Sequence, residues 1–453
     1  MIKILGSNGR ESMMKYGRLL MLLGTGLAPL SAAIADPVAS QKAAVDHTLD
    51  GDLPHLIAVY KDIHAHPELG FAETRTAALL AGEMRKAGFT VTEGVGKTGL
   101  VALYRNGPGP AVLVRTELDA LPLQEKTGLA YASTVQTTYK GRQTYVDHAC
   151  GHDAHMAIWL GTARALVAMK DRWHGTLMFV GQPAEEEISG AAAMLADGLY
   201  TRFPKPDYAF ALHTGAYAYG TVHYTSGAAT ANADTFEITF KGRGGHGSDP
   251  SKTIDPLLIA ARFVVDVQSL VSREKDPQKP GVVTVGAIEG GSAGNIIPDR
   301  VMLRGTIRNY DEGTRKLLKD GVARVARAEA EMAGAPPPDL AIGTETAVSV
   351  INDPDLTTST GRVFKAAFGD NAVAEPLPIT ASEDYSLFVN AGVPRSVDFM
   401  LGIYPPDRVA AAAHGGTALA SNHSPFYAPV PEPTIRTGVE AMSLAVMAVT
   451  GGN

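Results

Sequence analysis

The chain has 453 residues and a formal net charge of -7, from 40 Lys and Arg against 47 Asp and Glu. Hydrophobic residues make up 45% of the sequence, which allows a sizeable core and excludes a wholly disordered chain. The mildly acidic balance excludes the strongly basic surface of a nucleic-acid-binding protein. The length favours two or three domains. The single cysteine, Cys150, cannot form a disulfide within the chain.

Residues 1–35 are typical of an export signal. Basic residues precede an apolar run at 19–35, which ends in Ala-Ile-Ala, the small-x-small pattern that is cleaved, here before Asp36. A short membrane anchor is the alternative, but glycines and a proline interrupt the run, which falls short of the ~20 apolar residues of a span. We therefore expect a signal peptide cleaved after Ala35, a periplasmic or secreted protein, and no membrane span after cleavage.

From about residue 50 the chain alternates helical and strand patterns, which favours an α/β fold. Short apolar runs predict buried strands at 111–114, 176–180 and 207–212. Residues 153–170 have helical periodicity, with Asp153 as the expected N-cap. These elements predict a catalytic α/β domain whose two parts are residues 50–227 and 341–453.

The pattern changes in the middle of the chain. Alternating apolar residues predict half-exposed strands at 234–240, 281–288 and 300–309, and helical periodicity recurs at 255–271 and 313–332. This combination predicts an α+β domain at 228–340, inserted into the first domain. The proline-rich segment 335–338 is the expected link back.

Candidate metal ligands cluster at the start of the helix predicted at 153–170. His148, His152 and His155 lie within eight residues of one another, together with Cys150. A thiolate and an imidazole two residues apart can face one ion, and this pair suits a borderline metal such as Zn²⁺. The alternative is a buried thiol beside a polar helix start.

Three adjacent glutamates, Glu185 to Glu187, follow the strand predicted at 176–180, where an α/β sheet presents ligand-binding loops. A buried cluster of carboxylates is costly unless cations compensate it, and the alternative is a solvated acidic loop. His213 ends a predicted strand and His423 lies in a loop, and each alone could be structural. Together, five side chains could supply ligands for two divalent ions: Cys150, His152, Glu186, His213 and His423.

The sequence resembles a family of co-catalytic metallo-amidohydrolases that includes N-acyl-amino-acid amidohydrolases, hippurate hydrolases and plant auxin-conjugate hydrolases. The resemblance runs in order along residues 50–450. It rests on the motifs HAHPELGFAET (64–74), LDALP (118–122), HACGHDAH (148–155), GQPAEE (181–186), GRGGHG (242–247), GGSAGNIIP (290–298), SEDYSLF (382–388) and NHSP (422–425). It implies a catalytic α/β domain with a co-catalytic metal site and an inserted lid and dimerisation domain, hence a homodimer.

The resemblance also implies roles for single residues. The five side chains named above would bind two divalent ions per subunit, drawn from Zn, Mn, Co and Ni. Glu185 would be the general base that deprotonates a water, and Asp119, otherwise a turn residue at a strand end, would support the metal site. His246 and Asn295 would stabilise the oxyanion in the active site of the partner subunit. By spacing alone, His246 is an exposed turn residue.

Two features depart from this picture. Glu117 stands where the family usually has Asp, which leaves the metal and substrate preference open. His64 and His66 have a spacing that suits a metal site, but the family uses neither, and we expect both to be structural.

The expected function is metal-dependent hydrolysis of the amide bond of N-acyl-amino acids or similar small conjugates. A carboxypeptidase or dipeptidase is the alternative within enzymes. An inactive binding protein on the same scaffold is the alternative outside enzymes, and it would have no need of Glu185. The sequence does not specify the acyl group or the amino acid.

Overall fold

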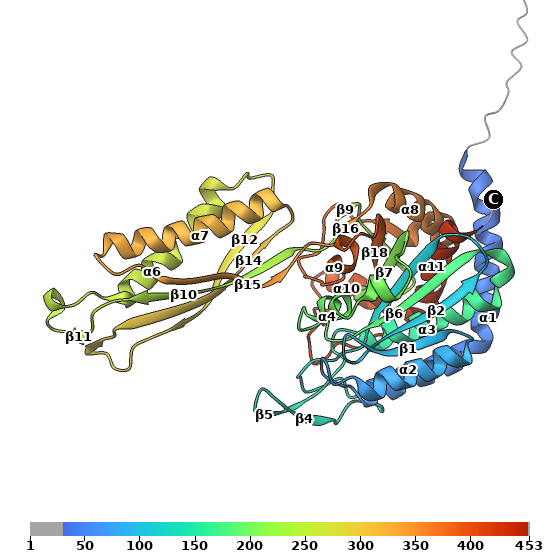
Figure 1. Cartoon of the computed structure of the whole chain (residues 1–453), viewed down its shortest axis with the longest axis horizontal. Coiled ribbons are helices and arrows are strands. Elements are labelled where there is room, and N and C mark those ends of the chain that lie inside the picture. The colour runs from blue at the N-terminus through green and yellow to red at the C-terminus, as the bar shows by residue number, and fades with distance from the viewer. Residues whose placement is uncertain (1–29, 452–453) are drawn as a thin grey trace, which may run out of the picture.

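A computed structural model describes residues 30–451 of the chain. Two units are visible in Figure 1: a large α/β domain, and an elongated smaller domain that projects from it. The expected signal peptide lies mostly outside the described residues, and the bond between Ala35 and Asp36 falls within the first helix, α1 (Leu30–Ala65). Among the described residues, no helix combines the length and the apolar character that crossing a membrane requires.

An eight-stranded sheet forms the centre of the large domain, in the order β1-β2-β6-β3-β7-β18-β8-β17. Its strands are β1 (Thr90–Val95), β2 (Gly99–Asn106), β3 (Ala111–Glu117), β6 (Gly175–Gln182), β7 (Tyr208–Ala218), β8 (Val222–Tyr224), β17 (Ala372–Ala374) and β18 (Arg395–Tyr404). β3, β6 and β7 correspond to the three strands predicted from apolar runs, so those predictions are confirmed.

Helices cover both faces of this sheet. The longer ones are α1, α2 (Thr74–Lys86), α3 (His152–Ala168), α8 (Pro354–Phe368) and α11 (Pro431–Thr450). The shorter ones are α4 (Gly190–Ala196), α5 (Leu199–Arg202), α9 (Ser386–Asn390) and α10 (Pro406–Ala413). Helices α1, α3 and α11 pack on one another and bury the largest apolar cluster of the described chain against one face. A second cluster lies between the other face and α4, α5 and α9.

The start of α3 differs from the prediction. The helix begins at His152, and Gly151 is the residue that precedes it. Asp153 lies inside the first turn and does not cap the helix; its carboxylate bonds to His64 at 2.6 Å. A buried histidine therefore takes as its partner the side chain that local sequence assigns to a cap.

The projecting domain has a four-stranded antiparallel sheet in the order β12-β14-β10-β15. Its strands are β10 (Asn232–Lys241), β12 (Gly281–Glu289), β14 (Arg300–Asn309) and β15 (Asp339–Ala347). Helices α6 (Pro256–Asp266) and α7 (Glu312–Met332) pack against it. A π-helical turn at Leu270–Glu274 follows α6. The proline-rich segment 335–338 leads from α7 into β15, so this sheet extends beyond residue 340, to Ala347.

Three short two-stranded pairings complete the described strands. They are β4 (Gln136–Tyr139) with β5 (Arg142–Tyr145), β9 (Gly227–Ala228) with β16 (Ile351–Asn352), and β11 (Gly245–His246) with β13 (Ile296–Ile297). Strands β3, β6 and β7 are parallel neighbours, so their carboxyl ends meet at one edge of the large sheet. Ligands bind in the crevice outside that edge in open α/β sheets.

Candidate active site

Cys150 and His152 flank the turn that opens α3. Gly151 between them has φ of 88°, a backbone conformation that glycine adopts without strain. A Cβ at this position would lie 2.3 Å from the hydroxyl oxygen of Thr214, so the turn also needs a residue without a side chain. The turn places the thiol of Cys150 and the imidazole of His152 in one buried cluster with Glu186.

The first of the three glutamates, Glu185, lies three residues after the end of β6. Glu185 Oε2 lies 3.9 Å from His152 Nε2, and Glu186 Oε1 lies 4.0 Å from the same nitrogen. Glu185 is 5% exposed, whereas Glu187 faces solvent. The backbone N–H of Ala184 donates to Glu73 Oε1 at 2.7 Å and fixes the turn. Two of the three adjacent carboxylates therefore point into the site.

Two histidines from distant parts of the chain reach Cys150. His213, on β7, donates from Nδ1 to the Thr214 carbonyl at 2.8 Å, and its Nε2 lies 3.4 Å from Cys150 Sγ. His423 Nε2 lies 3.4 Å from the same sulfur and 3.3 Å from Glu186 Oε2. All five predicted metal ligands thus lie at one site.

Asp119 supports this arrangement from the loop after β3. Its carboxylate accepts a hydrogen bond from the backbone N–H of Glu186 at 2.9 Å. Its backbone carbonyl accepts one from His152 Nδ1 at 2.8 Å, which leaves His152 Nε2 as the free nitrogen of the ring. Hydrogen bonds of this kind orient metal-ligating imidazoles.

The electrostatics of the site call for cations. Burial, followed by the charges of Glu186 and Glu185, raises the pKa of the Cys150 thiol well above its ordinary value. Burial lowers the pKa of His213 to about 3, so this imidazole is neutral, as a ligand must be. Burial also acts to lower the pKa of His152, but Asp119 and Glu117 outweigh it and raise that pKa to about 10.

Several atoms of the site have no hydrogen-bond partner although they are buried. They are His152 Nε2, Glu186 Oε1 and Asp119 Oδ1. Unpaired buried polar atoms are costly in a folded protein. Imidazole, thiolate and carboxylate donors together suit borderline divalent metals such as zinc. The residues present therefore fit the metal ions that the sequence predicted.

Glu185 lies beside two further carboxylates, those of Glu383 and Asp384, which were not among the predicted site residues. Oxygens of Glu185, Glu383 and Asp384 lie within 4.8 Å of one another. Burial, together with Glu383, Glu186 and Asp384, raises the pKa of Glu185 well above its ordinary value. The only sequence signal for this group was the motif SEDYSLF at 382–388. Such an environment is typical of a catalytic general base.

Arg115 neutralises part of this acidic group. It is 2% exposed and forms ion pairs with Glu117 and Glu383, the latter at 2.6 Å. Its Nε donates to Gln182 Oε1 at 2.9 Å, and Gln182 in turn donates to Asp384 Oδ1 at 2.5 Å. Strands β3 and β6 thereby hold the carboxylates behind Glu185 in place.

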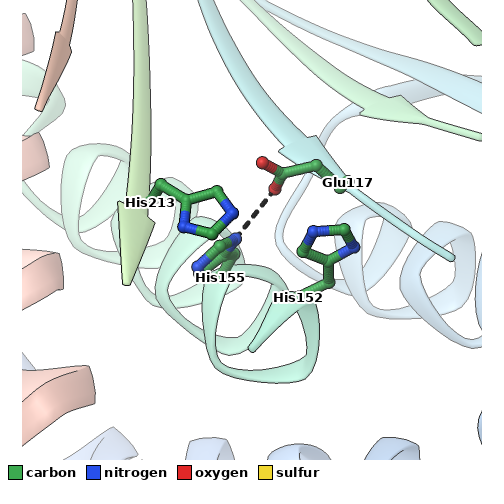
Figure 2. Close-up of side chains that lie close together, drawn as sticks. All are labelled: Glu117, His152, His155 and His213. Carbon is green, nitrogen blue, oxygen red and sulfur yellow. Dashed lines mark hydrogen bonds and ion pairs between the residues drawn. The ribbon is translucent and has the colours of Figure 1, made fainter. Parts of the chain in front are cut away.

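Figure 2 shows Glu117 among three imidazoles, those of His152, His155 and His213. His155 Nδ1 donates to Glu117 Oε2 at 2.9 Å, and His155 Nε2 accepts from the backbone N–H of Thr214 at 2.9 Å. Both nitrogens of His155 therefore have protein partners. One carboxylate oxygen of Glu117 pairs with Arg115, and the other accepts the hydrogen bond from His155. The longer side chain at this position is therefore accommodated in buried ion pairs.

A cavity of about 480 Å³ opens beside these residues. Its wall comes from both domains and includes Cys150, Glu185, Glu186, His213 and His423 on one side, and Thr235, Arg308 and Thr346 from the projecting domain on the other. Such a volume suits a small ligand.

His246 and Asn295 lie elsewhere. Both are exposed, and the backbone N–H of Gly247 donates to the Asn295 carbonyl at 2.8 Å, so the two loops are neighbours. Strand β11, which contains His246, lies at the end of the projecting domain that is remote from the large domain (Figure 1). The structure therefore brings together all the predicted site residues except these two.

Comparison with known proteins identifies the family. The family model described as Peptidase family M20/M25/M40 matches residues 113–448. The chain belongs to this family. The finding confirms the resemblance inferred from the motifs, and with it the class of metal-dependent hydrolases.

Three M20 relatives define the similarity further. A hippurate hydrolase of Campylobacter jejuni is 37% identical over 330 residues, 72% of this chain and 82% of that protein. Thermostable carboxypeptidase 1 of Saccharolobus solfataricus is 35% identical over 339 residues, 74% of this chain and 82% of that protein. The solved structure of Bacillus subtilis YXEP, described as a dinuclear metal binding peptidase from the M20 family, is 26% identical, with a TM-score of 0.71 over 88% of this chain and 99% of that one.

Proposed function

We propose that the protein hydrolyses the amide bond of N-acyl-amino acids with two divalent metal ions and with Glu185 as the general base. The observation that carries the proposal is the meeting of Cys150, Glu186, His213 and His423 beside Glu185 in the wall of one cavity, with His152 directly behind them in contact with Glu185 and Glu186. The relatives include a hippurate hydrolase, which is named for an N-acyl-amino acid.

The five ligand-type side chains would hold the two ions, with Cys150 central because His213 and His423 both contact its sulfur. When bound, such ions polarise the scissile carbonyl and lower the pKa of a water towards ~7. Zinc and manganese are the ions that we expect first, with cobalt and nickel as alternatives, because the donor set mixes sulfur, nitrogen and oxygen.

Glu185 would accept a proton from the attacking water and return it to the departing amine nitrogen. Burial and the neighbouring carboxylates raise the pKa of Glu185, which strengthens it as the acceptor of the water proton. Arg115 and Glu383 would position this carboxylate and keep the charge behind it balanced. Glu186 would bind metal, which gives adjacent glutamates different tasks.

Arg308 provides the recognition of the substrate. Among the described residues that line the cavity, it supplies the one guanidinium, and Ile379 and Met400 supply apolar side chains to the same wall. An N-acyl-amino acid presents a carboxylate next to the amide that is cleaved, and a guanidinium pairs well with a carboxylate. The apolar wall would accept the acyl group. Short peptides carry the same carboxylate. Because one relative is named a carboxypeptidase, peptide hydrolysis is the second candidate function.

The experiment is a hydrolysis screen on metal-loaded protein. N-acetyl-, N-benzoyl- and indole-acetyl-amino acids and dipeptides are compared, each with its carboxamide counterpart, and the released amine is quantified. We expect release from the carboxylates and a large loss with the carboxamides. Arg308→Ala should raise KM for the carboxylates, whereas Arg304→Ala, which removes an exposed arginine of the same strand, should not. Absence of release from every substrate would favour a binding protein.

We also infer a homodimer formed through the projecting domain. Strand β12 is at one edge of its sheet, and Val282 and Ile288 on this strand are 51% and 50% exposed. On α6, Leu258 is 52% and Val265 69% exposed. Exposed edges and apolar side chains favour pairing with another chain. In such a dimer, His246 and Asn295 of each subunit could reach the active site of the other subunit, as their expected role in stabilising the oxyanion requires.

We further propose that the protein is exported after cleavage at Ala35. Val38 is 4% exposed and packs against Val363 and Leu444, so the folded core begins directly after the expected cleavage point. Removal of residues 1–35 would leave these contacts intact.

A further inference from the structure

A second cluster of charged side chains is buried beneath the catalytic centre. It consists of His64 near the end of α1, Glu125 in the loop after β3, Asp147 just before the HACGHD motif, and Asp153 in α3. The side chains of His64, Glu125 and Asp153 are 0% exposed, and Asp147 as a whole residue is also 0% exposed. None of these residues is among the five catalytic metal ligands.

The contacts in this cluster resemble the surroundings of a metal ion. His64 Nδ1 lies 2.6 Å from Asp153 Oδ2, and His64 Nε2 lies 3.2 Å from Glu125 Oε1. Ligand atoms of His64, Glu125 and Asp147 all lie within 4.8 Å of one another. Two ligand atoms that each lie about 2.0–2.2 Å from one tetrahedral ion have a similar separation to the 3.2 Å between His64 Nε2 and Glu125 Oε1.

Asp147 is the unexplained member. Both of its carboxylate oxygens are buried and have no hydrogen-bond partner. Burial also raises the pKa of Asp147 to about 7, with a further contribution from Glu125. Buried ionised groups are normally paired or bound to metal. The side chain therefore lacks the partner that its position demands.

We propose that His64 Nε2, Glu125 and Asp147 bind a third divalent cation, separate from the catalytic pair. Asp153 accepts the hydrogen bond from His64 Nδ1 and would fix the ring, in the carboxylate–histidine–metal arrangement that is common at metal sites. An imidazole nitrogen with two carboxylates suits zinc or manganese. This proposal revises the expectation that His64 has a purely structural role.

A proton on His64 Nε2 is the competing explanation. That proton would pair His64 with Glu125 but would leave both oxygens of Asp147 without a partner. A divalent ion serves all three residues at once. It would also connect α1 and the loop after β3 to the segment that leads into Cys150, and so stabilise the base of the active site.

Metal counting on the full chain tests the proposal. Protein is stripped with a chelator, saturated with Zn²⁺, freed of unbound ion by gel filtration and analysed for zinc. We expect about three ions per chain in the wild type and about two in Asp147→Asn. Glu83→Gln is the matched control, because Glu83 is a buried acid that pairs with His55 at 2.8 Å outside the cluster, and it should leave the count unchanged. Two ions in the wild type, or an unchanged count in Asp147→Asn, would overturn the third site.

Removing the catalytic ligands separates this proposal from the proposed function. The variant Cys150→Ala/His213→Ala should lose the catalytic ions and keep one zinc, which the further change Asp147→Asn should abolish. With Co²⁺, the sulfur-to-metal charge-transfer band should vanish in Cys150→Ala/His213→Ala while one bound ion remains. Loss of all zinc from this variant would overturn the separate site and leave the catalytic assignment intact.

Thermal unfolding gives a measurement that does not depend on counting. Without metal, at a pH above the raised pKa of Asp147, Asp147→Asn should melt at a higher temperature than the wild type, because an uncompensated buried charge is removed. With saturating Zn²⁺ the order should reverse, because an ion that binds only the native state stabilises it. If Asp147→Asn folds poorly, Glu125→Gln replaces it in each measurement. The same order with and without metal would contradict the proposal.

Discussion

The carboxylate of Asp119 accepts a hydrogen bond from the backbone N–H of Glu186, with 2.9 Å between nitrogen and oxygen. The backbone carbonyl of Asp119 also accepts the bond from His152 Nδ1. One residue in the loop after β3 thereby positions two proposed metal ligands from two other elements, the loop after β6 and helix α3. The chain supports its metal site through the ends of adjacent parallel strands.

This relationship predicts the effect of truncating Asp119. Asp119→Ala should reduce metal affinity by about 10–100-fold, the usual cost of removing a residue that orients metal ligands. Competition with a chromogenic chelator measures the affinity. The control is Asp197→Ala, since Asp197 also accepts a backbone N–H, from Gly96 at 3.2 Å, but away from the site. Equal affinities of Asp119→Ala and the wild type would contradict the supporting role.

Glu185 and Glu186 should separate catalysis from metal binding. Glu185→Gln keeps the shape of the side chain and should retain both catalytic ions, but turnover should fall by ~10²–10⁴-fold because the general base is lost. Glu186→Gln should weaken metal binding as well. Elemental analysis and kinetics on the same samples distinguish the two effects. A metal-free Glu185→Gln protein would reverse the roles.

The thiol of Cys150 should report metal occupancy. In metal-loaded protein, coordination should shield it from alkylation, and chelation should make it reactive. Burial and the neighbouring glutamates raise the pKa of this thiol, so protons compete with the metal, and affinity should fall as the pH falls. Mass spectrometry after timed alkylation measures the first effect, and metal titration at several pH values measures the second. Identical labelling rates with and without metal would refute coordination by Cys150.

The sequence indicated the candidate ligands because their chemistry is local or lies at strand ends. Cys150 and His152 lie two residues apart, and Glu185 and Glu186 follow a buried apolar strand, so pattern and spacing marked them as candidates, and the family resemblance implied their separate roles. Arg115 was missed because its pairing with Glu383 joins residues far apart in the chain and follows no sequence period.

Contacts between distant parts of the chain also explain the other differences between the sequence-based predictions and the structure. Asp153 has the residue type and position of a helix cap, but His64 offers it a buried partner. Most of strand β15, residues 341–347, was assigned outside the inserted domain because the prolines before it suggested a linker, whereas its pairing with β10 places it in the four-stranded sheet. Neither pairing could be read from local sequence, since each depends on a segment far away in the chain.

Export predicts a defined N-terminus. Protein isolated from the cell envelope of the native source, or from its medium, should begin at or near Asp36, as N-terminal sequencing or intact mass would show. Replacing Ala35 with a bulky residue should block cleavage, because small residues are required there. A mature protein that starts at Met1 would contradict the signal peptide.

The remote position of His246 bears on assembly. Within one chain, β11 lies at the far end of the projecting domain (Figure 1). Glu185 lines the cavity that opens beside the metal-ligand candidates of the large domain. If His246 stabilises the oxyanion, it must therefore do so in the partner subunit. Each active site of the dimer would then combine Glu185 of one chain with His246 of the other.

Mixing two inactive variants tests this arrangement. His246→Ala and Glu185→Ala should each have little activity alone, since each dimer lacks one residue at both sites. After subunit exchange at equal concentrations, half of the dimers are mixed and each has one complete site, so activity should recover to about one quarter of the wild type. Native mass spectrometry must first show that mixed dimers have formed. Mixed dimers without recovered activity would mean that His246 serves its own subunit, because a complete site would then never arise from these two chains. Full activity of His246→Ala alone would mean that His246 takes no part in catalysis.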